Sequence, residues 1–213
     1  MEVFKVRSSM SGEIMPNSRK KGELSKSAKT YAETWLKEQI YGYKHEVSSK
    51  YMEKGIEVED ESIDYIAEEL GYGFLSKNTM SYENDFLTGT PDLIVDGVVI
   101  DIKNSWSHWT LPLFDTEIPN KGYYYQLQCY MALCNLDKAK LIYTLMDTPT
   151  DILNAWTDVP YSYEDIESKY RIKVFDVERS DEDIDKIYER VAECREYIKT
   201  LNSKLNEPSS IKF

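Results

Sequence analysis

One short segment of the chain holds two aspartates and a lysine at a spacing that could unite them in one site. The dipeptide Asp96-Gly97 stands between two β-branched runs, which predicts a hairpin with a two-residue type I′ turn. The register set by that turn places Asp92 opposite Asp101. Because side chains alternate along a strand, Asp92, Asp101 and Lys103 are predicted to share one face of the hairpin.

The opposite face of the same hairpin is wholly apolar, which predicts that it packs into the core. Its residues are Leu93, Val95, Val98, Ile100 and Ile102.

Two opposed carboxylates repel each other and destabilise a strand pair. A divalent cation between them reverses the sign of that interaction, and Mg²⁺ prefers hard oxygen ligands. Lys103 on the same face could stabilise a metal-activated hydroxide or the charge that develops on a phosphate. We therefore predict a metal site on Asp92 and Asp101. The alternative is an exposed polar face whose charges have no function.

A third carboxylate is predicted from a helix over about residues 49–70. At about 100° per residue, Glu59 falls on the apolar stripe of this helix, where an unpaired carboxylate is costly. Glu57 lies toward water and is the fallback if the helix has a different phase. The stripe consists of Met52, Gly55, Ile63, Ile66 and Leu70.

Gln126 and Tyr130 lie four residues apart in a third predicted helix, 122–135, and so share one face. A glutamine can hydrogen-bond a phosphate or a base, and a tyrosine can stack or donate. Packing at the rim of the core is the alternative for both.

Helical and strand patterns alternate along the chain, which predicts an α/β fold. Helices are predicted at 25–40, about 49–70, 122–135 and from Ser180 onward, and strands within 72–100, at 140–146 and at 171–176. The segment 11–23 has the composition of a polar loop. The last helix is long and carries a heptad-like seam, which leaves open self-association or packing on its own domain.

The length of 213 residues fits a single domain, 1–213. Its core is predicted at about 48–147, preceded by a basic helical segment, 1–47, and followed by a strand and helix, 170–206. Although the net charge is −12, residues 1–54 carry 11 Lys+Arg against 7 Asp+Glu. A basic N-terminal segment on an otherwise acidic chain can contact phosphates, or its charges can simply belong to a solvated loop.

Several classes of protein are disfavoured by composition. Three cysteines without a CxxC spacing argue against a disulfide framework, a zinc site and an iron–sulfur cluster. No apolar run approaches the roughly 20 residues of a membrane span, and no signal-peptide pattern is present at Met1–Lys5. The expected location is the cytoplasm, or the host cytoplasm if a phage encodes the chain.

Four motifs in order resemble the PD-(D/E)XK nucleases, more narrowly the RecB-type and YqaJ/lambda-exonuclease-like branch that includes phage recombination exonucleases. They are Gly55-Ile56-Glu57-Val58-Glu59, Gly89-Thr90-Pro91-Asp92, Asp101-Ile102-Lys103 and Gln126-x-x-x-Tyr130. The resemblance covers about residues 50–147. It implies a restriction-endonuclease-like core, with a central mixed β-sheet flanked by helices.

The resemblance also implies metal-dependent hydrolysis of phosphodiester bonds in DNA, with Mg²⁺ or Mn²⁺ as the cofactor. It implies that Asp92, Asp101 and the backbone carbonyl of Ile102 bind the metal, with Glu59 bound directly or through water. Lys103 is then catalytic, and Gln126 and Tyr130 position the DNA strand.

The same branch implies an exonuclease of DNA recombination, replication or repair, with a single-strand annealing or recombination protein as a further partner. Arg7 and Ser9 match loosely the residues of the branch that hold a terminal phosphate. Two alternatives stay open. One is a structure- or sequence-specific endonuclease, and the other is a disarmed nuclease fold that only binds DNA.

Overall fold

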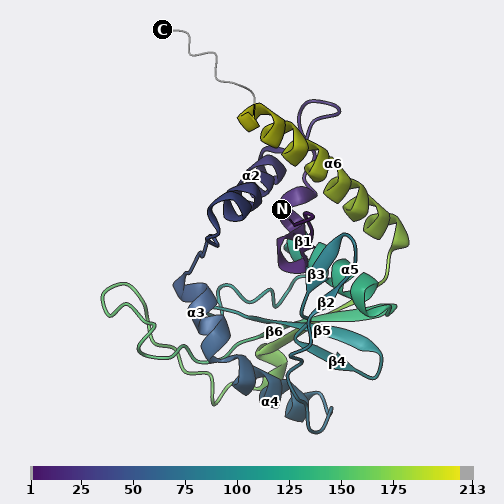
Figure 1. Ribbon diagram of the computed structural model, residues 1–213. Helices are drawn as coiled ribbons and strands as arrows, with labels where there is room; N and C mark the ends of the chain where they lie inside the picture. The colour runs from purple at the N-terminus through teal and green to yellow at the C-terminus, as the bar shows by residue number, and fades with distance from the viewer. Residues whose placement is uncertain (1, 207–213) are drawn as a thin grey trace.

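Two mixed β-sheets form the centre of the molecule (Figure 1). The computed structural model describes residues 2–206. The larger sheet has the order β4-β5-β6-β7 and is built from β4 (Leu93–Val95), β5 (Val98–Asn104), β6 (Lys138–Thr144) and β7 (Ile172–Glu178). The smaller sheet has the order β1-β3-β2 and is built from β1 (Val6–Arg7), β2 (Tyr82–Glu83) and β3 (Leu87–Gly89).

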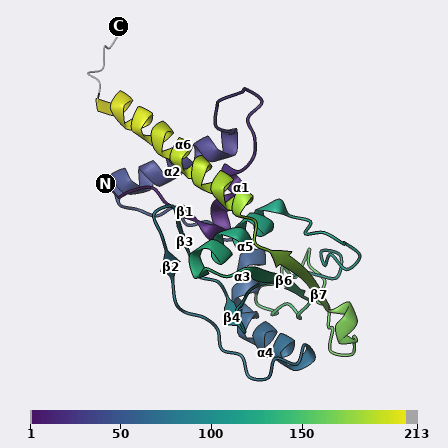
Figure 2. The ribbon, with the colours of Figure 1, turned by 90° about the vertical axis from the view of Figure 1, so that its right-hand side faces the viewer.

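Helices cover both faces of the larger sheet, as the sequence predicts. The α-helices are α1 (Ser11–Ile14), α2 (Lys26–Tyr41), α3 (Lys50–Glu57), α4 (Glu59–Glu69), α5 (Lys121–Cys134) and α6 (Asp181–Asn206), with 3₁₀ turns η1 (Ser8–Met10) and η2 (Ser168–Tyr170). The helix α4 packs on one face and α5 on the other, while α2 and α6 lie together beyond α5 (Figure 2).

The hairpin of β4 and β5 has the predicted turn and register. Asp96 and Gly97 both have positive φ values, 49° and 77°, as a type I′ turn requires. The pairs in the ladder are Val95↔Val98, Ile94↔Val99 and Leu93↔Ile100.

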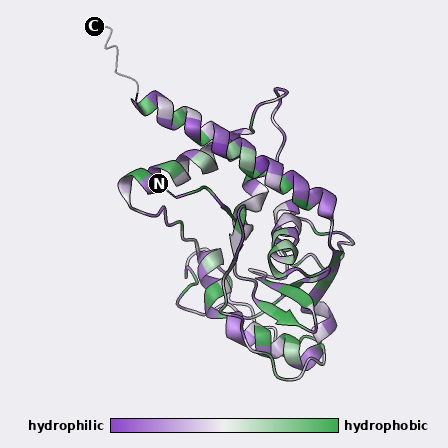
Figure 3. Ribbon diagram, turned by 45° about the vertical axis from the view of Figure 1, so that its right-hand side comes forward, coloured by the Kyte–Doolittle hydropathy of each residue, from purple (hydrophilic) through white to green (hydrophobic). Residues whose placement is uncertain are grey.

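The apolar face of the hairpin packs against α4, and β5 continues the sheet by pairing in parallel with β6. Figure 3 shows the strands of the larger sheet as mostly hydrophobic, whereas hydrophilic and hydrophobic residues alternate along α6.

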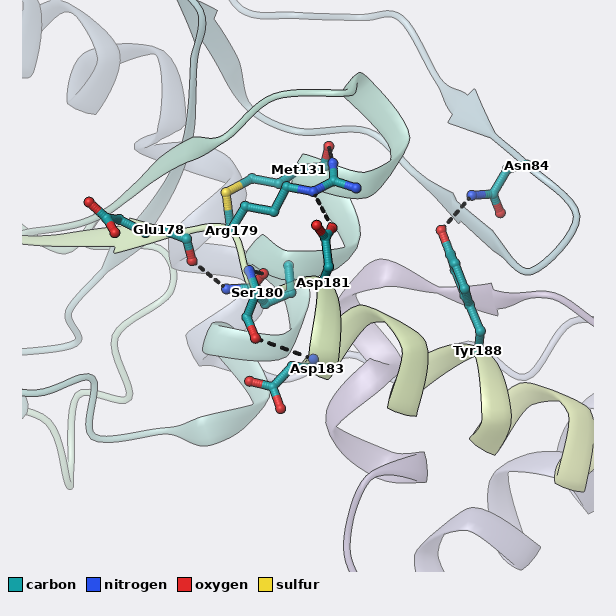
Figure 4. Close-up of polar contacts among 9 residues, drawn as sticks. Asn84, Met131, Glu178, Arg179, Ser180, Asp181, Asp183 and Tyr188 are labelled. Carbon is teal, nitrogen blue, oxygen red and sulfur yellow. Dashed lines mark hydrogen bonds and ion pairs between the residues drawn. The ribbon is translucent and has the colours of Figure 1, made fainter.

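The start of α6 is tied to α5 by polar contacts (Figure 4). Ser180 Oγ accepts from Asp183 N at 3.2 Å, which confirms Ser180 as the N-cap. Arg179 donates to Met131 O at 3.1 Å and to Asp181 Oδ1 at 2.7 Å. From there α6 buries a stripe against its own chain: Ile184, Ile187, Val191, Cys194 and Ile198. Self-association through this helix stays a prediction.

Three local predictions were wrong. The helix predicted at about 49–70 is two helices, because the backbone at Val58 leaves the helical region with φ −100° and ψ 10°. The polar segment 11–23 begins with the short helix α1. The segment 1–47 is not only helical, since its strand β1 pairs in parallel with β3.

Among residues 2–206, no helix is both long enough and apolar enough to cross a membrane.

Candidate active site

The two aspartates of the hairpin come together at the end of the β4–β5 ladder. Asp101 is 1% exposed, and Asp92 is half-buried. Regular pairing ends at Leu93↔Ile100, one step before them. Beyond that point the side chain of Asp92, instead of the backbone, bonds to β5: its Oδ2 accepts a hydrogen bond from Ile102 N at 2.7 Å.

The electrostatics of the pair show an excess of negative charge. Burial and the neighbouring charge of Asp101 raise the pKa of Asp92 to about 7, although Ile102 N and Lys103 oppose the shift. One proton therefore stays on the pair up to near-neutral pH when no cation is bound. A site with this charge has a physical reason to bind a cation.

The donor set fits a hard divalent cation. Asp101 Oδ2 is buried and is ion-paired with Lys103 Nζ at 2.7 Å. No three His, Cys, Asp or Glu side chains within residues 2–206 converge on one point. Two carboxylates with further oxygen ligands from backbone and water match Mg²⁺, which keeps several of its waters. The Ile102 carbonyl as a ligand stays a prediction.

Lys103 lies between Asp101 and an aromatic ring. Its Nζ is 2.7 Å from Asp101 Oδ2 and 4.8 Å from the centre of the Tyr123 ring. Burial disfavours the charged form of Lys103, but attraction to Asp101 and Asp92 outweighs burial and raises the pKa of the lysine. Lys103 therefore stays protonated and can neutralise negative charge in the site.

Gln126 and Tyr130 from α5 lie behind Asp101, and both are buried. Gln126 Nε2 donates to Asp101 Oδ1 at 2.9 Å and to Tyr130 Oη at 3.0 Å. The amide thus orients the carboxylate, whose other oxygen, Oδ2, is ion-paired with Lys103. Their predicted contact with DNA is untested by this arrangement and stays a prediction.

Glu59 is the first residue of α4 and faces the same region, as its predicted phase requires. It is half-buried, while Glu57 is exposed. Glu59 Oε2 accepts from Lys77 Nζ at 2.5 Å. Ser62, one turn along α4, donates to Asn104 Oδ1 at 2.5 Å and so fixes the start of the helix beside the end of β5.

The N-terminal residues reach the strand that leads into Asp92. Arg7 pairs with Thr88 in the sheet, and Ser8 Oγ donates to Thr88 O at 3.1 Å. A Cβ at Gly89 would overlap Ser8 and the Tyr130 ring, so glycine is required for this close packing. Arg7 and Ser9 are exposed beside it. Their role at a DNA end stays a prediction.

Two lysines were missed by the sequence reasoning. Lys77 pairs with Glu59, as described. Lys54 is fully buried and donates to the carbonyls of Ser105, Trp106 and Met146 at 2.8, 3.1 and 2.7 Å. Burial lowers the pKa of Lys54 to about 8.

The burial of Lys54 also corrects the predicted stripe of this helical region. The predicted stripe residue Met52 is 52% exposed, and Lys54 is buried in its place. The predicted helical phase of the apolar stripe was therefore right in α4 and wrong in α3.

Comparison with solved structures identifies the fold and the family. A phage-related exonuclease from Haemophilus somnus 129PT is 32% identical and superposes with a TM-score of 0.86, covering 96% of this chain and 98% of its own. An alkaline exonuclease from Laribacter hongkongensis is 19% identical, with a TM-score of 0.69 over 94% of this chain and 93% of its own. The latter enzyme has also been solved in complex with dAMP.

The fold is therefore that of a restriction-endonuclease-like nuclease. The chain belongs to the phage-related exonucleases, a phage-type branch of the PD-(D/E)XK nucleases. No protein-family model and no curated protein matches the sequence.

Proposed function

We propose that this chain is a divalent-metal-dependent DNA exonuclease that acts in DNA recombination, replication or repair. The observation that carries the proposal is the pair Asp92 and Asp101, in which burial and the neighbouring charge of Asp101 raise the pKa of Asp92 to about 7. The relation to exonucleases supports the reaction class.

Asp92, Asp101 and the Ile102 carbonyl would hold the Mg²⁺ or Mn²⁺, with Glu59 reaching it directly or through water. A cation held by these residues would supply an activated water and a positive charge for the scissile phosphate. Gln126 keeps Asp101 turned toward the site through its 2.9 Å hydrogen bond. Lys103, held protonated by the two aspartates, neutralises the charge that develops on the phosphate.

The preference for DNA ends rests on the N-terminal segment. Arg7 and Ser9 are exposed next to β3, which runs directly into Pro91 and Asp92. A terminal phosphate held there would lie beside the strand that precedes Asp92 in the chain. DNA is then the main partner, and a single-strand annealing or recombination protein in the cytoplasm would take up the strand that survives.

The test compares linear and closed circular duplex DNA, each incubated with Mg²⁺, with Mn²⁺ or with EDTA, and the products are sized over time. We expect progressive loss of linear DNA with either metal and none with EDTA. Equal activity in EDTA would rule out the metal mechanism. Circles cut as fast as linear DNA would favour the endonuclease alternative, and DNA bound but never cut would favour a disarmed fold.

A further inference from the structure

A second lysine, Lys77, lies at the edge of the candidate site beside Glu59. Lys77 Nζ lies 2.5 Å from Glu59 Oε2. The side chain of Lys77 is 44% exposed, whereas that of Glu59 is 20% exposed. The ammonium is thus both bonded to a site carboxylate and accessible from solvent.

The backbone on each side of Lys77 is fixed. Leu75 is buried in the apolar cluster between α4 and the larger sheet. On the other side, Asn78 N donates to Asp92 O and Asn78 Nδ2 to Pro91 O, both at 2.8 Å. Lys77 is therefore held beside the carboxylates by the segment between β3 and β4 that carries Asp92.

The ammonium of Lys77 supplies a positive charge beside Glu59 that a metal ion could supply in its place. Lys77 Nζ is ion-paired with Glu59 Oε2, and the carboxylates of Asp60 and Asp92 add negative charge around it. A divalent cation that recruited Glu59 would displace the ammonium by repulsion. An exposed ion pair of this kind contributes little to stability, so that exchange is easy.

We propose that Lys77 is a DNA-binding residue of the active site that exchanges Glu59 for a phosphate oxygen of the DNA. The proposal rests on the proposed nuclease function and adds one residue to it. Lys77 bonds Glu59 when the site is empty, and it bonds the DNA backbone once Glu59 is neutralised by a cation. Lysine suits this task because its ammonium is a compact charge with three donors on a flexible stem.

The test is a double-mutant cycle of DNA binding in EDTA, where no cleavage interferes. The four proteins are the wild type, Lys77→Gln, Glu59→Gln and the double variant. Glu59→Gln imitates neutralisation of Glu59 and frees Lys77. In that background we expect Lys77→Gln to weaken binding about tenfold, as for the loss of a hydrogen bond to a charged group. In the wild-type background we expect a much smaller loss.

The dependence of affinity on salt gives an independent readout. In the Glu59→Gln background, Lys77→Gln should reduce the slope of log affinity against log salt by about 1, the value of one phosphate contact. The matched control is Lys140→Gln, because Lys140 and Asp176 also form an exposed 2.5 Å ion pair. The control should change DNA affinity by the same factor, or not at all, in both backgrounds. Circular dichroism checks that every variant is folded.

The proposed exchange of Glu59 for a DNA phosphate would be overturned by either of two results. One is an equal loss of DNA affinity on Lys77→Gln in both backgrounds, and the other is an unchanged slope of log affinity against log salt. These outcomes differ from a failure of the proposed function. A protein that shows the predicted coupling but leaves DNA intact with Mg²⁺ would contradict the nuclease and keep the role of Lys77 in binding. An active nuclease without the coupling would contradict the role of Lys77 alone.

Discussion

The two faces of β5 differ in the side chains that pack against them. On one face Ile100 and Ile102 pack against Ile63, Ile66 and Ile142, so apolar side chains alone fill the space. On the other face, displaced by a single residue, Asp101 and Lys103 lie under Gln126 and Tyr130 of α5. Both faces are buried, but only the second contains ionised groups.

This difference separates stability from chemistry within one strand. The apolar face gains free energy from burial without any ligand. The polar face keeps the buried carboxylate of Asp101, ion-paired with Lys103, beside a second carboxyl group, Asp92, that is partly protonated near neutral pH. Strain of this kind is expected where a site is arranged for function. Substitutions on the two faces should therefore have different consequences.

The largest effect is expected from Asp101→Asn. Loss of this charge removes a metal ligand, and cleavage of linear DNA should fall by more than about 100-fold, beyond the usual cost of losing an indirect partner of a metal. The measurement is the initial rate of DNA loss with Mg²⁺. Asp96→Asn is the matched control on the same hairpin, because asparagine tolerates the positive φ of that turn position. A comparable loss in the control would contradict the assignment.

Glu59→Gln should lower the rate of cleavage by about 10- to 100-fold, the range for groups that bind a metal through water or orient its ligands. Glu57→Gln should leave the rate near that of the wild type, because Glu57 is exposed on the preceding helix. Rates at saturating DNA and Mg²⁺ are compared. If Glu57→Gln lowers the cleavage rate more than Glu59→Gln, the carboxylate of the site does not come from α4.

On the apolar face, Ile100→Ala should lower the free energy of unfolding by about 2–5 kcal/mol, the range for large-to-small changes in a core. The cleavage rate per folded molecule should change little, since the side chain points away from the carboxylates. Urea unfolding measures the first quantity, and activity normalised to the folded fraction measures the second. A stable but inactive variant would break the proposed separation of the two faces.

A smaller effect concerns pH. The pKa of Asp92 is about 7 in the folded, metal-free protein, against 3.8 as its ordinary value. Between these values the folded state holds a proton that the unfolded chain has released, so this contribution to stability is present at low pH and lost as pH rises toward 7. Relative to Asp92→Asn, the wild type should therefore lose stability over this range. Parallel pH profiles of the two proteins in EDTA would refute this expectation.

The sequence was informative where local rules act. The pair Asp96-Gly97 set the turn, and the turn set the register of β4 and β5, because a slip of one residue would expose the apolar face. The same period of two placed Asp101 and Lys103 together. Phase on α4 placed Glu59 toward the site, since Ser62, Ile63 and Ile66 on the same side are buried.

Contacts between distant segments could not be predicted. Lys54 is buried only because carbonyls of residues 105, 106 and 146 converge on it. From its local pattern alone a lysine belongs at the surface.

The direct contacts of Asp101 were not predicted, although the hairpin register placed Lys103 on the same face, and these contacts change one expectation. The repulsion between Asp92 and Asp101, taken alone, predicts that neutralising Asp101 stabilises the metal-free protein. The structure adds Lys103 at 2.7 Å and Gln126 at 2.9 Å. Asp101→Asn would leave Lys103 without its partner, so the metal-free variant should be no more stable than the wild type.

The central claim, that Asp92 and Asp101 bind a divalent cation, is tested most directly by thermal unfolding with and without Mg²⁺, followed against Asp101→Asn and the control Asp96→Asn. A ligand at 100 times its Kd stabilises the native state by about 2.7 kcal/mol. For a chain of this size that corresponds to a rise in Tm of about 5–10 °C. We expect this rise in the wild type and in Asp96→Asn, and almost none in Asp101→Asn. An equal rise in all three proteins, or none in the wild type, would contradict the metal site.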